Sequence, residues 1–150
     1  MISYRPAQAA DMADLTRVRV AVTENALNLE QLLARGISPE SVAQSFLEDS
    51  KGWVAELDGR ICGFSIADRK SKSIFALFVE PGFENRGMGG RLLNLAVDWL
   101  WAIGVDKIWL TTGPATRAAG FYSRRGWIRK GRTGDGTDDL YELERPASVT

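Results

Sequence analysis

A glycine-rich segment in the middle of the chain has the residue types and spacing to bind an anion. It reads Pro81-Gly82-Phe83-Glu84-Asn85-Arg86-Gly87-Met88-Gly89-Gly90 and is called the glycine turn below. It lies between a strand-like run, Ser73 to Val79, and a helix-like run, Arg91 to Ile103. A turn that opens into a helix leaves backbone N–H groups unpaired, and the helix dipole adds positive charge there. Phosphate or pyrophosphate is the natural ligand, although glycines needed only for close packing give the same pattern.

The absence of histidine limits the chemistry of any active site. The chain has no histidine and one cysteine, Cys62. It therefore has no Ser-His-Asp triad, no Cys-His pair, no imidazole metal site and no intrachain disulfide, and we expect no metal. Any proton transfer has to use carboxylates, tyrosine, lysine, the cysteine or water.

Composition favours one globular domain over residues 1–150, with a frayed tail at 146–150. The chain is 45% hydrophobic and 25% charged, and its 19 basic and 19 acidic side chains cancel. Without net positive charge, nothing argues for a nucleic-acid partner. The apolar stretches end before the roughly 18 residues that a membrane span needs. The first residues lack the pattern of a signal peptide, so we expect a cytoplasmic protein.

Helices and a hairpin are predicted before the glycine turn. A strand at 2–5 precedes a helix from Asp11 to near Asn25, a short helical piece at 28–35 and a helix capped by Ser38. Strand-like runs at 53–57 and 60–66 flank Asp58-Gly59, a pair suited to a two-residue turn with positive φ. Ser73 to Val79 then forms a third antiparallel strand.

The second half alternates helices and strands. After the helix at 91–103 come a strand at 107–111, a helix at 116–125, and strands at 127–130 and 140–143. The order β-α-α-β-β-β-α-β-α-β-β predicts an α/β (α+β) fold. Its sheet is mixed, mostly antiparallel, with about six to seven strands and helices on both faces.

These features resemble the GCN5-related N-acetyltransferase (GNAT) superfamily. Val79-Glu80-Pro81 and Arg86-Gly87-Met88-Gly89-Gly90 are similar to the family's strand-end proline and its Q/R-x-x-G-x-G/A loop. Ala118-Ala119-Gly120-Phe121-Tyr122-Ser123-Arg124-Arg125-Gly126-Trp127 is similar to its A-x-x-F-Y-x-x-x-G-F/W segment. The specific likeness covers Ser73 to Lys130, and Thr111 to Arg117 resembles one bacterial subset. The first 70 residues match in element order only.

The resemblance implies that the anion is the pyrophosphate of acetyl-CoA, the expected co-substrate. In similar proteins the strand that contains Leu77, Phe78 and Val79 splays from the next one, and the pantetheine arm pairs with its backbone. The residues placed against acetyl-CoA are Leu77, Phe78, Val79, Glu84, Asn85, Arg86, Gly87, Met88, Gly89, Gly90, Arg91, Arg117 and Phe121.

Two positions depart from the family's pattern. Glu84 stands where Gln or Arg is usual, and a carboxylate aimed at the phosphates would repel them. Ala115 replaces an Asn, which removes one expected hydrogen bond. A basic cluster, Arg124-Arg125 with Arg129-Lys130-Arg132, is a candidate for the 3'-phosphate of CoA or a solvated face.

The implied reaction is acetyl transfer to a primary amine of a small molecule or peptide by direct attack. Tyr122 matches the tyrosine that protonates the departing thiolate, and its alternative is a packing role. Glu80 and Glu24 are candidates for the general base, or else solvated surface. Glu24 and Asn25 also lie where similar proteins bind the acceptor, and Trp53 is a candidate for cleft lining or core.

Two other functional classes fit parts of the pattern. A noncatalytic acyl-CoA-binding regulator would use the same fold. A dinucleotide-binding domain is disfavoured, because three antiparallel strands precede the glycine turn. Similar proteins are often dimers, which leaves a homodimer open.

Overall fold

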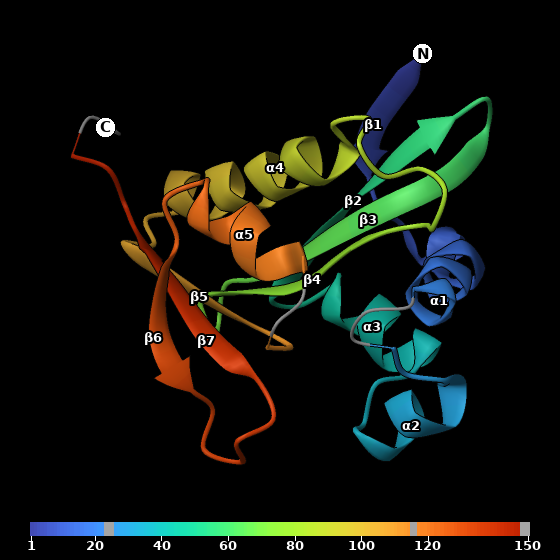
Figure 1. Cartoon of the computed structure of the whole chain (residues 1–150). Coiled ribbons are helices and arrows are strands. Elements are labelled where there is room, and N and C mark those ends of the chain that lie inside the picture. The colour runs from blue at the N-terminus through green and yellow to red at the C-terminus, as the bar shows by residue number, and fades with distance from the viewer. Residues whose placement is uncertain (23–25, 115–116, 148–150) are drawn as a thin grey trace.

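The computed structural model describes residues 1–22, 26–114 and 117–147. The seven strands are β1 (Ile2–Pro6), β2 (Ser50–Leu57), β3 (Arg60–Asp68), β4 (Ser73–Val79), β5 (Lys107–Thr112), β6 (Ile128–Arg132) and β7 (Asp139–Glu144). The helices are η1 (Ala9–Asp11, a 3-10 turn), α1 (Met12–Ala21), α2 (Leu29–Ala34), α3 (Pro39–Ser45), α4 (Met88–Ala102) and α5 (Arg117–Ser123). Figure 1 shows their arrangement.

The strands form one sheet in the order β1-β2-β3-β4-β5-β7-β6, and only β4 and β5 are parallel. The predicted hairpin joins β2 and β3, with Asp58 at φ 53° and Gly59 at φ 79°. Positive φ at both turn residues matches the right-handed twist of the flanking strands. The mixed, mostly antiparallel sheet and the order of elements confirm the fold class expected from the sequence.

A bulge in β4 changes which side chains face each side of the sheet. Ile74 is paired with Ala67 and Ala76 with Ile66, so Phe75 has no partner on β3. One extra residue reverses the alternation of a strand. Ile74 and Leu77 therefore pack on the α4 side of the sheet, while Ala76 packs on the α1 side.

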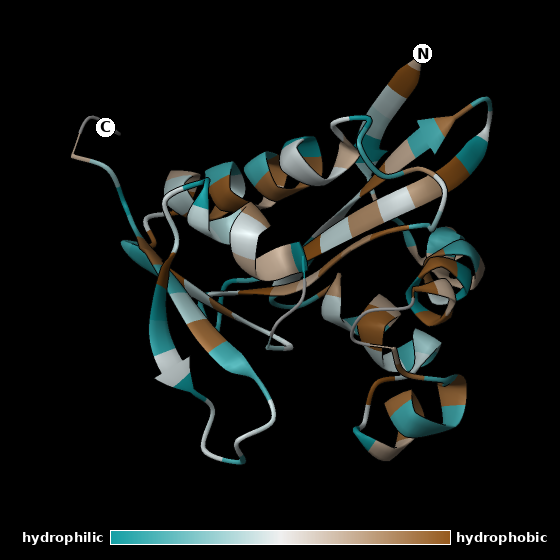
Figure 2. Cartoon of the chain, in the orientation of Figure 1, coloured by the Kyte–Doolittle hydropathy of each residue, from teal (hydrophilic) through white to brown (hydrophobic). Residues whose placement is uncertain are grey.

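The sheet lies between two helical layers. Helices α4 and α5 lie on one face, and α1 and α3 lie on the other (Figure 1). Figure 2 shows brown, hydrophobic residues alternating with paler ones along β3, between these layers. The Ser65 hydroxyl donates a hydrogen bond of 2.9 Å to the carbonyl of Leu92 and fastens α4 to β3. The sheet is thus a rigid platform for residues at the ends of β4 and β5.

Three α-helices precede β2, in the three segments that the sequence predicts to be helical. Asn28 and Ser38 cap α2 and α3, and each side chain accepts a hydrogen bond from the backbone three residues on. Helix α1 ends at Ala21, earlier than expected, because Val22 takes an extended conformation. Asp11 precedes α1, but its carboxylate accepts two hydrogen bonds from the Arg5 guanidinium.

Candidate active site

The glycine turn presents unpaired amides at the start of α4. Gly87 is the N-cap of the helix, with a left-handed φ of 83°, and Asn85 is also left-handed, at 63°. The first backbone bond of the helix runs from the Arg91 amide to the Gly87 carbonyl. In the described part of the chain, the amides of Met88, Gly89 and Gly90 have no acceptor. These donors and the helix dipole suit the pyrophosphate of acetyl-CoA.

An aromatic side chain of α5 and a cationic side chain of the turn that follows α5 lie beside the glycine turn. A Cβ added at Gly89 would lie 3.5 Å from the Phe121 ring, and one at Gly90 would lie 3.0 Å from Nη2 of Arg125. The Arg125 guanidinium stacks on Phe121, 3.7 Å from the ring centroid. The structure therefore places Arg125 beside the turn, where sequence reasoning had assigned it to a broader basic cluster.

Two other arginines of the basic cluster pair with an acidic residue. Arg129 and Arg132 each form a 3.0 Å ion pair with the buried carboxylate of Asp139 on β7. Closer to the turn, the Arg86 guanidinium lies 5.4 Å from the centroid of Phe83. The guanidinium of Arg91 lies 5.7 Å from the ring of Tyr4 on β1.

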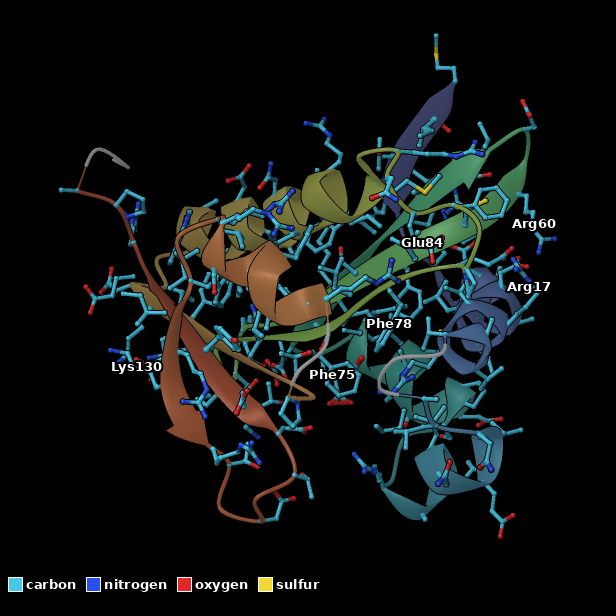
Figure 3. All side chains as sticks on the ribbon, in the orientation of Figure 1. Arg17, Arg60, Phe75, Phe78, Glu84 and Lys130 are labelled. Atoms are coloured by element: carbon cyan, nitrogen blue, oxygen red, sulfur yellow. The ribbon has the colours of Figure 1, made fainter. Side chains whose placement is uncertain are left out.

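The Glu84 carboxylate is held within its own turn (Figure 3). Its Oε1 accepts a 2.6 Å hydrogen bond from the Gly82 amide, and its Oε2 lies 3.6 Å from Nη2 of Arg117. Backbone hydrogen bonds to the carboxylate and the charge of Arg117 lower the pKa of Glu84. The side chain stays anionic and joins the turn to the first residue of α5.

Strands β4 and β5 diverge after one paired position. Ser73 is paired with Trp109, and the Trp109 amide donates to the Lys72 carbonyl. Beyond that point, among the described residues, β4 has no strand partner on its β5 side. The backbone of Leu77, Phe78 and Val79 therefore borders an opening in the sheet. Unpaired strand groups of this kind suit an extended ligand that carries amides.

Tyr122 lies on α5 between the glycine turn and the sheet. Its ring packs edge-on against Phe121 at 5.2 Å and Trp127 at 5.8 Å, and it lies 6.1 Å from Tyr141. Burial raises the pKa of Tyr122 strongly, so its hydroxyl is neutral at any physiological pH. No described residue hydrogen-bonds this hydroxyl, which leaves it able to contact a ligand.

Glu80 is buried, and its carboxylate forms ion pairs with two arginines, Arg17 and Arg60. Arg17 of α1 donates to its Oε1, and Nη2 of Arg60 donates to both carboxylate oxygens at 3.0 and 2.9 Å. Burial acts to raise the pKa of Glu80, but the hydrogen bonds from Arg60 and Arg17 outweigh it, so the pKa lies below its usual value. The arrangement is that of a carboxylate that positions the end of β4, and it makes Glu80 a weak base.

A cavity of about 400 Å³ lies on the opposite side of the sheet from α4, and we call it the acceptor cavity. Both strands of the opening line it. The lining residues of β4 are Ser73, Ile74, Phe75, Ala76 and Phe78, and those of β5 are Trp109, Thr111 and Thr112. Helices α1, α2 and α3 supply the remaining apolar wall, and Phe75 and Phe78 of β4 face them (Figure 3). A volume of this size matches common small-ligand sites.

The acceptor residues expected from the sequence are only partly placed here. Glu24 and Asn25 lie outside the described residues. Trp53 is buried on the α4 side, with its ring 6.0 Å from Trp99, and is not among the residues that line the acceptor cavity. Odd-numbered residues of β2 face α4, so the strand's own alternation turns Trp53 away from the cavity.

Sequence reasoning missed three charged residues that line this cavity. They are Arg19 of α1, Arg35 at the end of α2, and Asp138 in the loop before β7. None belongs to a recognisable motif. The one available signal was the expectation that the acceptor binds near Glu24 and Asn25, at the end of the first predicted helix.

The described residues form neither a metal cluster nor a membrane-spanning helix. Across residues 1–22, 26–114 and 117–147, no group of cysteine and acidic side chains is arranged to hold a metal ion. In the same residues, no helix has the length and apolar character needed to cross a membrane.

Known proteins share both the fold and part of the sequence. The mycothiol acetyltransferase of Beutenbergia cavernae is 29% identical over 110 residues, which are 69% of this chain and 35% of that protein. The chain thus matches about a third of that relative's length. The PaiA N-acetyltransferase from Thermoplasma acidophilum, solved with coenzyme A, superposes with a TM-score of 0.81 at 17% identity. That match covers 97% of this chain and 99% of the other.

A second solved structure gives the same result. The ribosomal-protein-S18-alanine N-acetyltransferase of Escherichia coli has a TM-score of 0.74 at 20% identity, covering 100% of this chain and 96% of that one. The sequence model of the acetyltransferase (GNAT) family matches residues 20–127 of the 150. The match spans more than two thirds of the chain, and the chain therefore belongs to the acetyltransferase (GNAT) family.

Proposed function

We propose that this protein transfers an acetyl group from acetyl-CoA to a primary amine of a small molecule or peptide. The observation that carries the proposal is the opening between β4 and β5. The glycine turn, with its unpaired amides, follows β4 directly, and the acceptor cavity is lined by both strands of the opening. A thioester bound along β4 and an amine in the cavity would therefore meet at the opening.

The residues divide the binding of acetyl-CoA between them. Amides at the start of α4 would bind the pyrophosphate, and Arg86 and Arg125 would add positive charge. The backbone of Leu77 to Val79 would pair with the amides of the pantetheine arm. Gly89 and Gly90 have no Cβ, and this leaves room beside the turn for the Phe121 ring and the Arg125 guanidinium.

The chemistry is attack of the neutral amine nitrogen on the thioester carbonyl. A C–N bond forms, the tetrahedral intermediate expels the thiolate as the C–S bond breaks, and the nitrogen loses a proton. Tyr122 would donate a proton to the thiolate and recover one from solvent. Burial raises the pKa of Tyr122, so the hydroxyl carries its proton before the reaction and has one to donate.

Of the two carboxylates expected as candidates for the general base, Glu80 fits that role poorly. Glu80 is held by Arg17 and Arg60 and has a lowered pKa, so we assign it to positioning β4 rather than to proton abstraction. Solvent water at the mouth of the acceptor cavity, or Glu24, is left to accept the proton of the ammonium.

A titration and one assay test this proposal. Isothermal titration with acetyl-CoA, CoA and NAD is followed by a thiol-release assay over a panel of primary amines. We expect acetyl-CoA binding and release of CoA with at least one amine. Binding of CoA without release for any amine would instead assign the protein to the noncatalytic acyl-CoA-binding regulators. Binding of NAD with no binding of CoA would contradict both.

A further inference from the structure

The acceptor cavity has an apolar floor that is open to solvent. Phe75, pushed outward by the bulge in β4, is 48% exposed, and Trp109 and Leu29 at the rim are 39% and 46% exposed. Large apolar side chains that gather at a concave site indicate a ligand with an apolar body.

Two arginines meet at the helical side of this cavity. The Arg19 guanidinium lies over the Phe78 ring, 4.2 Å from its centroid, and Arg35 follows α2. Burial, and to a smaller extent the charge of Arg35, lower the pKa of Arg19, because both disfavour its charged form. No described residue forms an ion pair or hydrogen bond with the Arg35 side chain. Two converging cations favour an anionic ligand, above all a carboxylate, whose geometry matches guanidinium groups.

A negative group lies at the other side of the cavity. The loop between β6 and β7 contributes Asp138, whose backbone is held by two hydrogen bonds with Thr133. Its carboxylate has no partner among the described residues. Figure 1 shows this loop and helices α1 and α2 on opposite sides of the point where β4 and β5 diverge. The charges of the cavity are thus separated, acidic beside β5 and β7 and basic beside α1 and α2.

We propose that the acceptor is a short apolar peptide with a free N-terminal amine and a free C-terminal carboxylate. The ammonium of the peptide would lie beside Asp138, near the opening. Its apolar side chains would pack against Phe75 and Phe78. Its carboxylate would lie between Arg19 and Arg35. The opposite charges lie on different elements of the cavity, so an acceptor with a spacer between its ammonium and carboxylate suits it better than a single α-amino acid, in which one carbon carries both. This proposal rests on the proposed acetyltransferase function.

The test compares peptides that differ only in the terminal charge. The thiol-release assay measures kcat/KM for Leu-Phe and Leu-Leu-Phe and for their C-terminal amides. A charge-assisted hydrogen bond contributes about 1.5–3 kcal/mol, so we expect the amides to react at least about tenfold more slowly. Equal rates for acid and amide, or faster reaction of the amide, would overturn the proposal.

The variant Arg35→Gln assigns the effect to the cavity. In this variant the ratio of kcat/KM for the acid to kcat/KM for the amide should be close to one. The value of kcat/KM for the amides should stay within about twofold of wild type, and the KM for acetyl-CoA should not change. Arg69→Gln, an exposed arginine paired with Asp49, is the matched control and should keep the wild-type ratio. Arg35 is exposed, so folding should be unaffected, which circular dichroism and the melting temperature will verify. A ratio that Arg35→Gln leaves unchanged would contradict the assignment.

Failure of the acetyltransferase proposal is distinguishable from failure of this one. If CoA binds but no amine releases thiol, N-acetyl-Leu-Phe and its amide are titrated into the CoA-bound protein. Tighter binding of the acid that disappears in Arg35→Gln supports the peptide site by itself. Equal or absent binding of the two overturns it.

Discussion

In the proposed mechanism, Tyr122 is the residue on which the chemistry depends most. Tyr122→Phe removes the proton donor but keeps the ring that packs on Phe121 and Trp127. We expect turnover to fall at least about tenfold, since general acid catalysis commonly contributes 10²–10⁴-fold, with acetyl-CoA affinity within about twofold of wild type. Steady-state kinetics and titration calorimetry measure the two quantities.

Tyr141→Phe is the matched control for that substitution. Tyr141 is equally buried and its ring lies 6.1 Å from that of Tyr122, but it belongs to β7 and has no assigned role in the reaction. Its turnover should stay near that of wild type. Unchanged turnover in Tyr122→Phe would remove the tyrosine from the mechanism.

Glu84 places a negative charge at the turn that is proposed to bind the pyrophosphate of acetyl-CoA. Glu84→Gln keeps an oxygen that accepts from the Gly82 amide but removes a negative charge near the bound phosphates. We expect the Kd for acetyl-CoA to fall about two- to fivefold at low salt and less at high salt, because screening weakens the repulsion. Calorimetry at two ionic strengths measures this. Glu40→Gln, exposed on α3, should have no effect, and weaker binding by Glu84→Gln would show that the carboxylate supports the site.

At the scale of the elements, the start of α4 depends on one left-handed residue. Gly87 caps the helix with φ 83°, a conformation that costs an ordinary L-residue about 1–2 kcal/mol. Gly87→Ala should lower the free energy of unfolding by about that amount and weaken acetyl-CoA binding, because the amides of the turn are displaced. Urea unfolding and calorimetry test both effects.

The loop glycine Gly134 provides the comparison for Gly87. It has open space around its Cα and no positive φ, so Gly134→Ala should be neutral or slightly stabilising. Equal stability of the two alanine variants would mean that the turn adapts to a side chain at position 87.

At the scale of the whole molecule, Glu80 joins three parts of the fold. It ends β4, its amide donates to the Cys62 carbonyl of β3, and its carboxylate binds Arg17 of α1 and Arg60 of β3. Breaking a buried, charge-assisted network leaves its partners unsatisfied. The carboxylate therefore contributes to stability, and through the position of β4 it affects the opening in the sheet.

The pH dependence of stability tests this role. The pKa of Glu80 is lowered from 4.5, so its stabilising effect is complete above that pH and is lost as the pH falls through the lower folded-state value. We expect Glu80→Gln to be less stable than wild type by about 1–3 kcal/mol at pH 7 and the difference to shrink below pH 4.5. Urea unfolding at pH 7 and pH 3 measures it.

The exposed residue Glu144 serves as the reference for this experiment. Glu144→Gln should change stability little at either pH, since it ends β7 at the surface. A Glu80→Gln difference that is the same at pH 7 and pH 3 would show that packing, rather than the charge, carries the effect.

The sequence by itself determined the order of elements and the glycine turn. Asp58-Gly59, Ser38-Pro39 and the periodicity of the α4 segment act over a few residues, so the chain itself contains the information. The strand at 73–79 was predicted with its observed bounds. The family resemblance likewise rested on contiguous segments.

The tertiary structure alone decided how side chains from distant segments meet. The bulge at Phe75 depends on its register with β3, and no local pattern predicts which residue of a strand will lack a partner. The capture of Glu80 by Arg17 and Arg60, and the charges that line the acceptor cavity, join residues far apart in the sequence. A side chain's partners, and with them its pKa, follow from packing across the whole fold, so the chemistry at the opening could be assigned only once the sheet was assembled.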